Sequence, residues 1–217
     1  KTLMESGVNA DIIVCRTEHK LSNAIKNKIA LFCNVKNEAV IESIDAETIY
    51  DVPILMQKER LDKEVLKKLG LSTIKSSKMD RWRVFLDKLK NSSITVRIGL
   101  VGKYVELQDS YKSILESLIH AGVANEVKVK IITIHSESIN DTNLNELLVK
   151  LNGIIVAPGF GERGIEGKIK AIRYSRENRI PFLGICLGMQ MAVIEFARNV
   201  LKLEDVNSTE MKENCKN

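Results

Sequence analysis

A cysteine between two glycines is the feature of this sequence with the clearest chemistry. Cys186 has Gly184 two residues before it and Gly188 two residues after it. The apolar run at 180–185 predicts a short buried strand, and apolar residues at helical spacing over 189–200 predict a helix. Glycines allow a sharp strand-to-helix turn and a close approach of a substrate carbonyl. The pattern predicts a nucleophile elbow, with a buried structural cysteine as the alternative interpretation.

A thiol in such an elbow lies at a helix N-terminus, where the helix dipole and free N–H groups favour both a thiolate and an oxyanion. This is the chemistry of thiol-dependent acyl transfer, which normally also needs a histidine oriented by a carboxylate. The three histidines are His19, His120 and His135, and none of them follows Cys186. His120 closes a helix-like run and His135 lies at a strand end, so we expect solvated or capping roles for both.

A glycine-rich loop lies one strand-helix unit before the elbow, at 158–164. A flexible turn is one interpretation of such a loop. Because two N–H groups commonly hold a tetrahedral oxygen, the loop is also the expected source of a second donor. The pair would be the N–H of Leu187 and one from the region of Gly159.

The amino-acid composition limits the classes of protein to which this chain can belong. The chain has 217 residues, of which 44% are hydrophobic and 28% charged, as in a globular protein with one large or two modest domains. No apolar run approaches the roughly 18 residues of a membrane span, and no leader segment opens the chain, so we expect a cytoplasmic protein without a membrane partner. The formal charge is +5, but lysines and arginines are scattered among acidic residues, which disfavours nucleic acid as a partner.

The four cysteines, Cys15, Cys33, Cys186 and Cys215, lack metal-ligand spacing, so we expect reduced thiols and no metal site. Cys15 and Cys33 lie in strand-like runs, which predicts that they are buried as small hydrophobic residues.

Strands and helices alternate along the chain, which is typical of an α/β protein. A first unit is predicted from strand-like runs at 8–15, 30–35 and 39–41 and from helices at 22–28 and 59–69. Serines and asparagines mark 71–93 as a linker around a helix at 79–89. A second unit is predicted from strands at 94–101, 127–134, 153–156 and 180–185 and from helices near 110–120, 143–148, 167–176 and 189–200. This alternation predicts a doubly wound parallel sheet with its sites beyond the carboxyl ends of the strands.

The elbow and the preceding glycine-rich loop resemble the class I glutamine amidotransferases. More narrowly, the chain resembles the CTP synthase family, on the segments 28–35, 101–113 and 207–210. The resemblance covers almost the whole chain. It implies that 1–70 is the C-terminal part of an α/β P-loop-type amidoligase (synthetase) domain, that 71–93 is a linker, and that 94–217 is the N-terminal part of a glutamine amidotransferase domain.

The implied activity is the ATP-dependent amination of UTP to CTP in de novo pyrimidine nucleotide synthesis, with ammonia supplied by glutamine hydrolysis. The resemblance further implies Mg²⁺ and ATP as cofactors, GTP as an activator, CTP as a feedback inhibitor and a homotetramer. The magnesium carboxylates and the phosphate loop are expected upstream of Lys1, and a His-Glu pair downstream of Asn217. The chain begins without methionine and ends in a polar run at 212–217, so we expect a fragment that is inactive alone.

The resemblance also implies roles for particular residues, beginning with Cys186 as the nucleophile that forms a glutamyl thioester. The implied glutamine-binding positions are Gly159, Leu187, Gly188, Met189, Gln190 and Glu210. The implied nucleotide-binding positions are Lys28, Ile44, Asp45 and Ala46. The loop at 160–167 resembles a lid through which GTP stimulates hydrolysis. Lys28 as a solvated lysine and Asp45 as a helix cap are the plainer interpretations.

One position departs from the family pattern. The commoner family loop is Pro-Gly-Gly-Phe-Gly, and Pro158 stands here where a glycine is usual. Because proline donates no N–H, the donor role falls to Gly159. Two other functions remain open: the glutaminase part of a different class I amidotransferase, and a non-catalytic regulatory module that keeps the fold.

Overall fold

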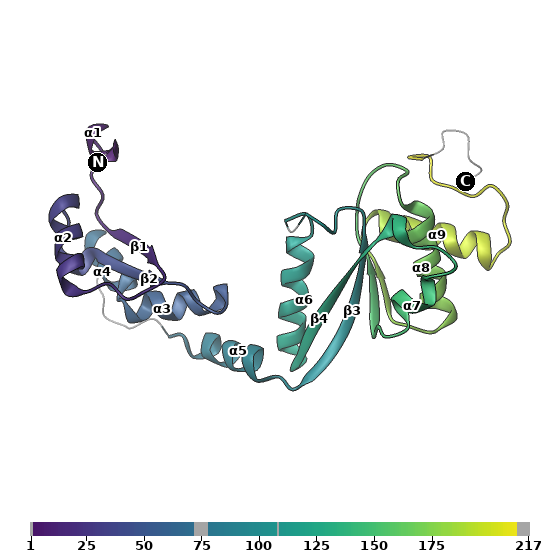
Figure 1. Cartoon of the computed structure of the whole chain (residues 1–217), viewed down its shortest axis with the longest axis horizontal. Coiled ribbons are helices and arrows are strands. Elements are labelled where there is room, and N and C mark those ends of the chain that lie inside the picture. The colour runs from purple at the N-terminus through teal and green to yellow at the C-terminus, as the bar shows by residue number, and fades with distance from the viewer. Residues whose placement is uncertain (1, 72–77, 108, 212–217) are drawn as a thin grey trace. The chain divides into compact units, whose positions relative to one another are not determined.

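A computed structural model describes residues 2–71, 78–107 and 109–211 (Figure 1). Its contacts divide the chain into two compact units, Lys1–Asp87 and Lys88–Asn217. The linker serines Ser72, Ser76 and Ser77 and the fourth cysteine, Cys215, lie outside the described residues.

The first unit contains a pair of parallel strands, in which Ile13 lies beside Val40 and Thr17 beside Ile44. The strands are β1 (Ile13–Thr17) and β2 (Val40–Ile44). The helices of the unit are α1 (Thr2–Glu5), α2 (Asn23–Cys33), α3 (Val52–Lys58), α4 (Leu61–Lys68) and α5 (Asp80–Asn91), with 3₁₀ turns η1 (Asn37–Ala39) and η2 (Ile49–Asp51). Helix α2 connects β1 to β2, which confirms the predicted strand-helix-strand order.

The predicted strand at 30–35 is wrong, because these residues form the last turns of α2. The helix ends at Asn34, which adopts a left-handed conformation (φ 52°) and lets Val35 N–H donate to Ala30 O at 3.0 Å. A short apolar run with few β-branched residues fits a helix as well as a strand. Cys33 therefore ends a helix, and neither it nor Cys15 is fully buried.

Aromatic contacts hold the start of α5 against the rest of the first unit. The indole N–H of Trp82 donates to Tyr50 O at 2.8 Å, and the Trp82 ring stacks on Phe85 with centroids 5.4 Å apart. Phe85 also lies 5.1 Å from the ring of Tyr50. Part of the predicted linker is thus a helix with an apolar side of its own.

The second unit is a four-stranded parallel sheet in the order β4-β3-β5-β6. Its strands are β3 (Ile94–Gly102), β4 (Val127–His135), β5 (Gly153–Val156) and β6 (Phe182–Gly184). Its helices are α6 (Lys112–Ala124), α7 (Leu144–Leu148), α8 (Ile165–Glu177) and α9 (Leu187–Asn199), with a 3₁₀ turn η3 (Ser136–Ser138). This confirms the predicted α/β fold with a parallel sheet.

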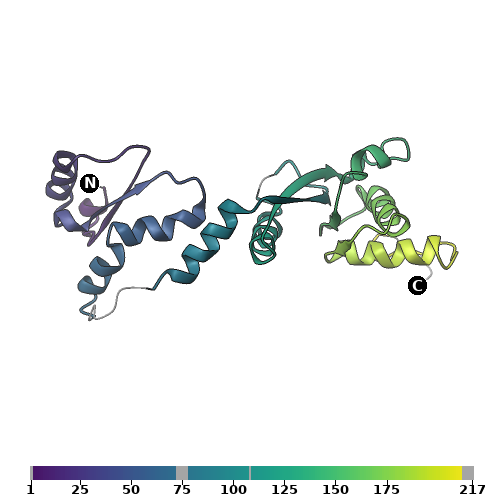
Figure 2. The same ribbon diagram turned by 90° about the horizontal axis from the view of Figure 1, so that it is seen from below.

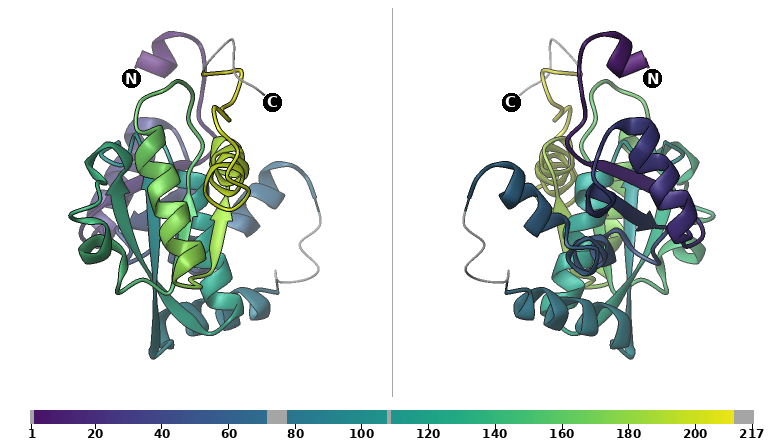
Figure 3. Two further views of the ribbon diagram at one scale, coloured as in Figure 1. Left: turned by 90° about the vertical axis from the view of Figure 1, so that its right-hand side faces the viewer. Right: turned by 90° about the vertical axis from the view of Figure 1, so that its left-hand side faces the viewer.

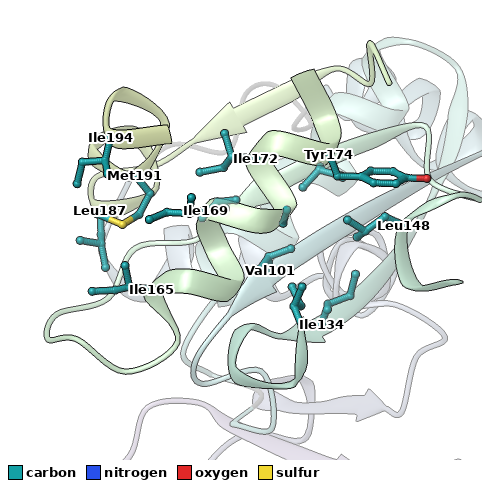
Figure 4. Packing of buried hydrophobic residues seen from close by; sticks show 14 of the residues in the cluster. Val101, Ile134, Leu148, Ile165, Ile169, Ile172, Tyr174, Leu187, Met191 and Ile194 are labelled. Carbon is teal, nitrogen blue, oxygen red and sulfur yellow. The ribbon is translucent and has the colours of Figure 1, made fainter. Parts of the chain in front are cut away.

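Helices cover both faces of this sheet. Helices α8 and α9 pack against each other over one face, as Figures 2 and 3 (left) show, and Ile169 and Met191 meet there in the larger core cluster (Figure 4). On the other face, residues of α6 pack against Leu100 and Ile155. Neighbouring strand residues such as Leu100 and Val101 thus enter opposite cores, as the two-residue period of a strand requires.

The prediction that 180–185 forms a buried strand is only half right. Strand β6 pairs with β5 on one side and is the last strand in the order of the described sheet. Its middle residue, Leu183, is 55% exposed. Apolar sequence alone does not distinguish a central strand from an edge strand.

A buried carboxylate pairs with a partly exposed arginine where α9 meets α8. Glu195 is 1% exposed, and its carboxylate accepts hydrogen bonds from Arg176 at 2.8–3.2 Å and from the Asn199 side chain at 3.2 Å. The hydrogen bond that Arg176 donates to Glu195 is the main cause that raises the pKa of Arg176. Separately, no helix in the described ranges is both long and apolar enough to span a bilayer.

Candidate active site

Cys186 lies on the turn between β6 and α9, as its glycine spacing predicts. Its backbone has φ 53° and ψ −108°, a conformation that L-residues rarely adopt, and its side chain is exposed. Such strain at an exposed thiol is typical of a nucleophile elbow.

The glycines around Cys186 bring the start of α9 against the sheet. A Cβ on Gly188 would lie 2.2 Å from Val156 O, and a Cβ on Gly184 would lie 2.5 Å from the carbonyl carbon of Gly188. The N–H of Ile185 donates to the same Val156 oxygen at 3.0 Å. Only glycine fits at 188, and the close approach that it allows places Cys186 beside the carboxyl end of β5.

Several backbone N–H groups at the elbow and in the glycine-rich loop have no acceptor among the described residues. Those of Leu187, the first residue of α9, and of Gly159 are among them. Gly159 has φ 149°, a conformation that favours glycine. These are the two donors that the sequence predicts for an oxyanion, and both remain unpaired.

Two buried lysines hold the carbonyl groups of the glycine-rich loop. Lys168, on α8, donates from Nζ to Ala157 O at 2.9 Å. Lys103, just after β3, donates to Phe160 O at 2.6 Å and also to Gly161 O. Burial, followed by repulsion from Lys103, lowers the pKa of Lys168 to about 8. Burial also lowers the pKa of Lys103.

The loop at 160–167 is tied to the neighbouring segments by Arg163. Its guanidinium lies 2.9 Å from the Glu137 carboxylate and 5.9 Å from the centre of the Tyr104 ring. Phe160, at the beginning of the loop, is 81% exposed. The predicted lid therefore has one anchored arginine and one solvent-facing aromatic side chain.

Ser208 links Gln190 and Glu210, two of the predicted glutamine-binding residues. The Ser208 hydroxyl donates to Gln190 Oε1 at 3.2 Å and accepts the Glu210 N–H at 3.3 Å. The Glu210 residue is exposed, and Met189 also faces solvent. The segment after α9 is thereby brought to the first turn of that helix, next to Cys186.

The histidines lie on other elements. His120 is inside α6, which continues to Ala124, and His135 ends β4. The His135 ring nitrogen accepts the Glu137 N–H at 3.3 Å, which confirms its capping role. His19 follows β1 in the first unit.

The predicted nucleotide-binding turn lies beside a hollow of about 490 Å³ in the first unit. Ile44, Asp45 and Ala46 line this hollow at the carboxyl ends of the two parallel strands, together with Arg16. Arg16 Nε lies 3.2 Å from the Asp45 carboxylate. The next 3₁₀ turn, η2, is capped by Thr48, so Asp45 is not a helix cap. Lys28 is exposed on α2 and does not line the hollow.

No three His, Cys, Asp or Glu side chains gather as a metal site within the ranges that the structure describes.

Sequence reasoning missed Lys168, although the sequence does carry a signal for it. Ile165, Ile169 and Ile172 form the buried stripe of α8, and a lysine at 168 occupies a core position of that stripe. Lysine is almost never fully buried without a partner, so its position in the stripe is the signal.

The structure also contains a basic hollow of about 740 Å³ at the amino ends of the strands, which the sequence pattern does not predict. Parallel register places Arg97 beside Lys130, and Lys128 and Lys150 line the same hollow. The prediction that basic residues are scattered is therefore wrong for this surface.

Comparisons with known proteins agree with this geometry. The family described as Glutamine amidotransferase class-I matches residues 106–217, and the one described as CTP synthase N-terminus matches residues 1–71. The chain is 65% identical over 216 residues to a CTP synthase of Christiangramia forsetii, and 55% identical over 222 residues to that of Methanocaldococcus jannaschii. All of the chain is covered in both cases, but only 40% and 41% of the relatives. It therefore spans about two fifths of the length of the curated relatives it matches.

A solved structure is similar over the second unit. It is described as "Trypanosoma brucei CTPS - glutaminase domain with bound acivicin", with a TM-score of 0.52 and 40% identity, covering 55% of this chain and 47% of that one. The match at 1–71 disfavours a different amidotransferase fused to an unrelated synthetase. The elbow, the loop and these matches together show that the chain belongs to the class I glutamine amidotransferase family and has the two-part make-up of the CTP synthases.

Proposed function

We propose that this chain contributes the glutamine-hydrolysing thiol of an enzyme that aminates UTP to CTP with the energy of ATP. The observation that carries the proposal is the exposed Cys186 in a strained turn, with two unpaired N–H groups at Leu187 and Gly159. The CTP synthases to which the chain is similar supply the substrate class.

The chemistry at Cys186 follows from this arrangement. The thiolate attacks the side-chain carbonyl carbon of glutamine, so a C–S bond forms while the carbonyl oxygen becomes an oxyanion. The N–H groups of Leu187 and Gly159 hold that oxyanion. The C–N bond then breaks as the nitrogen takes a proton from water and leaves as ammonia. Water next hydrolyses the thioester, which gives glutamate and returns the free Cys186 thiol.

Glutamine is positioned by the segment that Ser208 ties to α9. We assign the Glu210 carboxylate to the substrate α-amino group, because opposite charges attract and a carboxylate accepts its N–H groups. The backbone from Leu187 to Gln190 contacts the carboxamide end. This gives one charged contact at the far end of the substrate and two donors at the reacting end.

In the first unit, the turn at Ile44, Asp45 and Ala46 is proposed to contact the adenine of ATP, and Lys28 a UTP or CTP nucleotide. The hollow beside the turn supports the first assignment. We further propose GTP activation through the loop at 160–167, a requirement for Mg²⁺, feedback inhibition by CTP, a homotetramer and a cytoplasmic location. No step is assigned to Mg²⁺.

The test measures CTP formation from UTP and ATP by the native protein that contains this chain, with either glutamine or ammonium as the nitrogen source. We expect Cys186→Ser to abolish the glutamine-dependent reaction and to leave the ammonium-dependent one within about twofold. Cys33→Ser, a second partly exposed thiol, is the matched control and should change neither reaction.

Two outcomes would overturn the proposal. Glutamine hydrolysis without CTP would favour another amidotransferase. No turnover by the unaltered protein with either nitrogen source would favour a non-catalytic module.

A further inference from the structure

The basic hollow lies at the amino ends of β3 and β4, at the opposite end of the sheet from the elbow. Its volume of about 740 Å³ is within the range of roughly 300–1,000 Å³ that is typical of small-molecule sites. The residues that line it are Thr95, Arg97, Lys128, Val129, Lys130, Lys150 and Asn152. Among these described residues four are cationic, and none is acidic or aromatic.

The sheet leaves this end of β3 and β4 uncovered. Strand β3 pairs with β4 along its whole length but with β5 only from Ile98 to Val101, so the two strands project past the amino end of β5 (Figure 1). Because side chains alternate along a strand, Arg97 lies on the same face as Val101, and Lys130 on the same face as Ile134. Val101 and Ile134 belong to the larger core cluster. The basic residues therefore occupy the exposed continuation of that apolar face.

The described residues do not neutralise the positive charges in the hollow. Arg97 lies directly beside Lys130 in the strand register, and like charges at such positions repel each other. Within the ranges that the structure describes, none of the four cationic side chains has a carboxylate within ion-pair distance. Glu126, two residues before Lys128, is paired with Lys88 at 2.7 Å. An anion from outside the chain would relieve this repulsion.

Two neutral donors lie among the cations. The Arg97 N–H donates to Asn152 Oδ1 at 2.9 Å, and the Asn152 N–H donates to Arg97 O at 2.8 Å. These bonds fix the Asn152 amide, whose Nδ2 group has no acceptor among the described residues. The Thr95 hydroxyl is also without a partner in that part of the chain. Ammonium, guanidinium, amide and hydroxyl groups are all donors that bind phosphate oxygens.

We propose that this hollow binds the polyphosphate group of a small anion, whose linked phosphates contact the four cations together with Thr95 and Asn152. The phosphate chain is the recognised part, because the described lining offers no aromatic side chain on which a base could stack. Several linked phosphates match four clustered charges better than a single phosphate does. The inference does not depend on the chemistry at Cys186, and the hollow is separate from the one beside Ile44.

The experiment measures the acetylation rate of individual lysines by N-hydroxysuccinimidyl acetate, with peptide mass spectrometry of the native protein that contains this chain. The probe is inorganic tripolyphosphate at about 0.15 M salt, without added nucleotide. We expect it to slow acetylation of Lys128, Lys130 and Lys150 at least about fivefold, with one shared half-saturating concentration below about 0.1 mM. Lys202, an exposed lysine after α9, should react at an unchanged rate.

Two variants at Arg97 separate the effect of charge from that of structure. Arg97→Gln removes one cation and should raise the half-saturating concentration of tripolyphosphate about tenfold, as expected for the loss of one charged hydrogen bond. Arg97→Lys keeps the charge and should raise it no more than about threefold. Lys202→Gln is the matched control outside the hollow and should leave it unchanged. Because protection is measured at Lys128 and Lys130 themselves, tripolyphosphate bound at another site does not imitate this pattern.

A comparison of ligands identifies the source of the phosphate chain. ATP and tripolyphosphate should both protect Lys128 and Lys130, whereas adenosine should not. Equal protection by the two supports the proposal with inorganic polyphosphate as a sufficient ligand. Stronger protection by ATP supports it with a nucleoside triphosphate as the ligand.

Any of four results would overturn the inference. Tripolyphosphate fails to protect these lysines below about 1 mM, or orthophosphate protects them equally well, which would indicate counter-ion binding only. Protection in Arg97→Gln equals that in the unaltered protein. The lysines are already unreactive without an added anion, which would place a protein surface over the hollow. Each of these results leaves the proposed function intact, since that function is tested separately by Cys186→Ser.

Discussion

The hydroxyl of Ser208 lies 3.2 Å from Oε1 of Gln190 and thereby fastens the segment after α9 to the first turn of that helix. The same oxygen accepts the N–H of Glu210, the carboxylate assigned to the α-amino group of glutamine. A single hydroxyl thus links the residue that we propose to anchor the substrate, Glu210, to Gln190 in the first turn of α9.

Ser208→Ala is expected to raise KM for glutamine about three- to tenfold with little change in kcat, because one or two hydrogen bonds that position Glu210 are lost. Steady-state glutaminase kinetics of the native protein measure this. Ser117→Ala is the control, since that hydroxyl bonds only to the backbone of its own helix. An unchanged KM would show that Ser208 does not position the glutamine site.

Gly188→Ala should prevent α9 from seating on β5, because the added methyl would lie 2.2 Å from Val156 O. We expect a loss of about 2 kcal/mol in the free energy of unfolding, as for other overpacked sites. Alkylation of Cys186 should also lose its selectivity. Val193→Ala, at an exposed position of α9, should change the stability by less than about 0.5 kcal/mol. Equal stabilities of the two variants in urea denaturation would refute the close approach.

Arg176→Ala should lower the free energy of unfolding by about 3 kcal/mol, because it leaves the buried carboxylate of Glu195 without its guanidinium partner. Arg173→Ala removes a half-exposed guanidinium that pairs with Glu177 and should cost no more than about 1 kcal/mol. Urea denaturation of both variants gives the comparison. Similar losses would mean that burial does not strengthen the Glu195 pair.

The stability of the chain relative to Lys168→Met should rise with pH between about 8 and 10.5. Burial holds the pKa of Lys168 at about 8, against the usual 10.5 of a lysine, so the unfolded state binds more protons in this window. The stability gap should change in favour of the unaltered chain by about 3 kcal/mol between pH 7 and pH 10. Chemical denaturation at both pH values measures the gap, and a constant gap would show that burial does not lower the pKa of Lys168 in the folded protein.

The sequence predicts what is encoded locally. The turn at Cys186 follows from glycines at 184 and 188, whose spacing is a property of a few adjacent residues. The alternation of strands and helices in the second unit is equally local, because each element carries its own period.

Long-range packing explains what the sequence does not predict. The apolar run at 30–35 is compatible with either a helix or a strand, and only its packing against the rest of the unit selects the helix. The basic hollow depends on the register that places Arg97 beside Lys130. Lys168 is informative only once α8 is known to turn that residue inward against the loop at 157–161.

The most direct measurement of the central claim is site-specific labelling by a glutamine-mimicking chloroketone, followed by peptide mapping. The native protein should form an adduct at Cys186 at least about tenfold faster than at Cys15 or Cys33, and excess glutamine should protect Cys186 alone. Equal labelling of the three thiols, or labelling of Cys186 that glutamine does not slow, would contradict an activated nucleophile at the elbow.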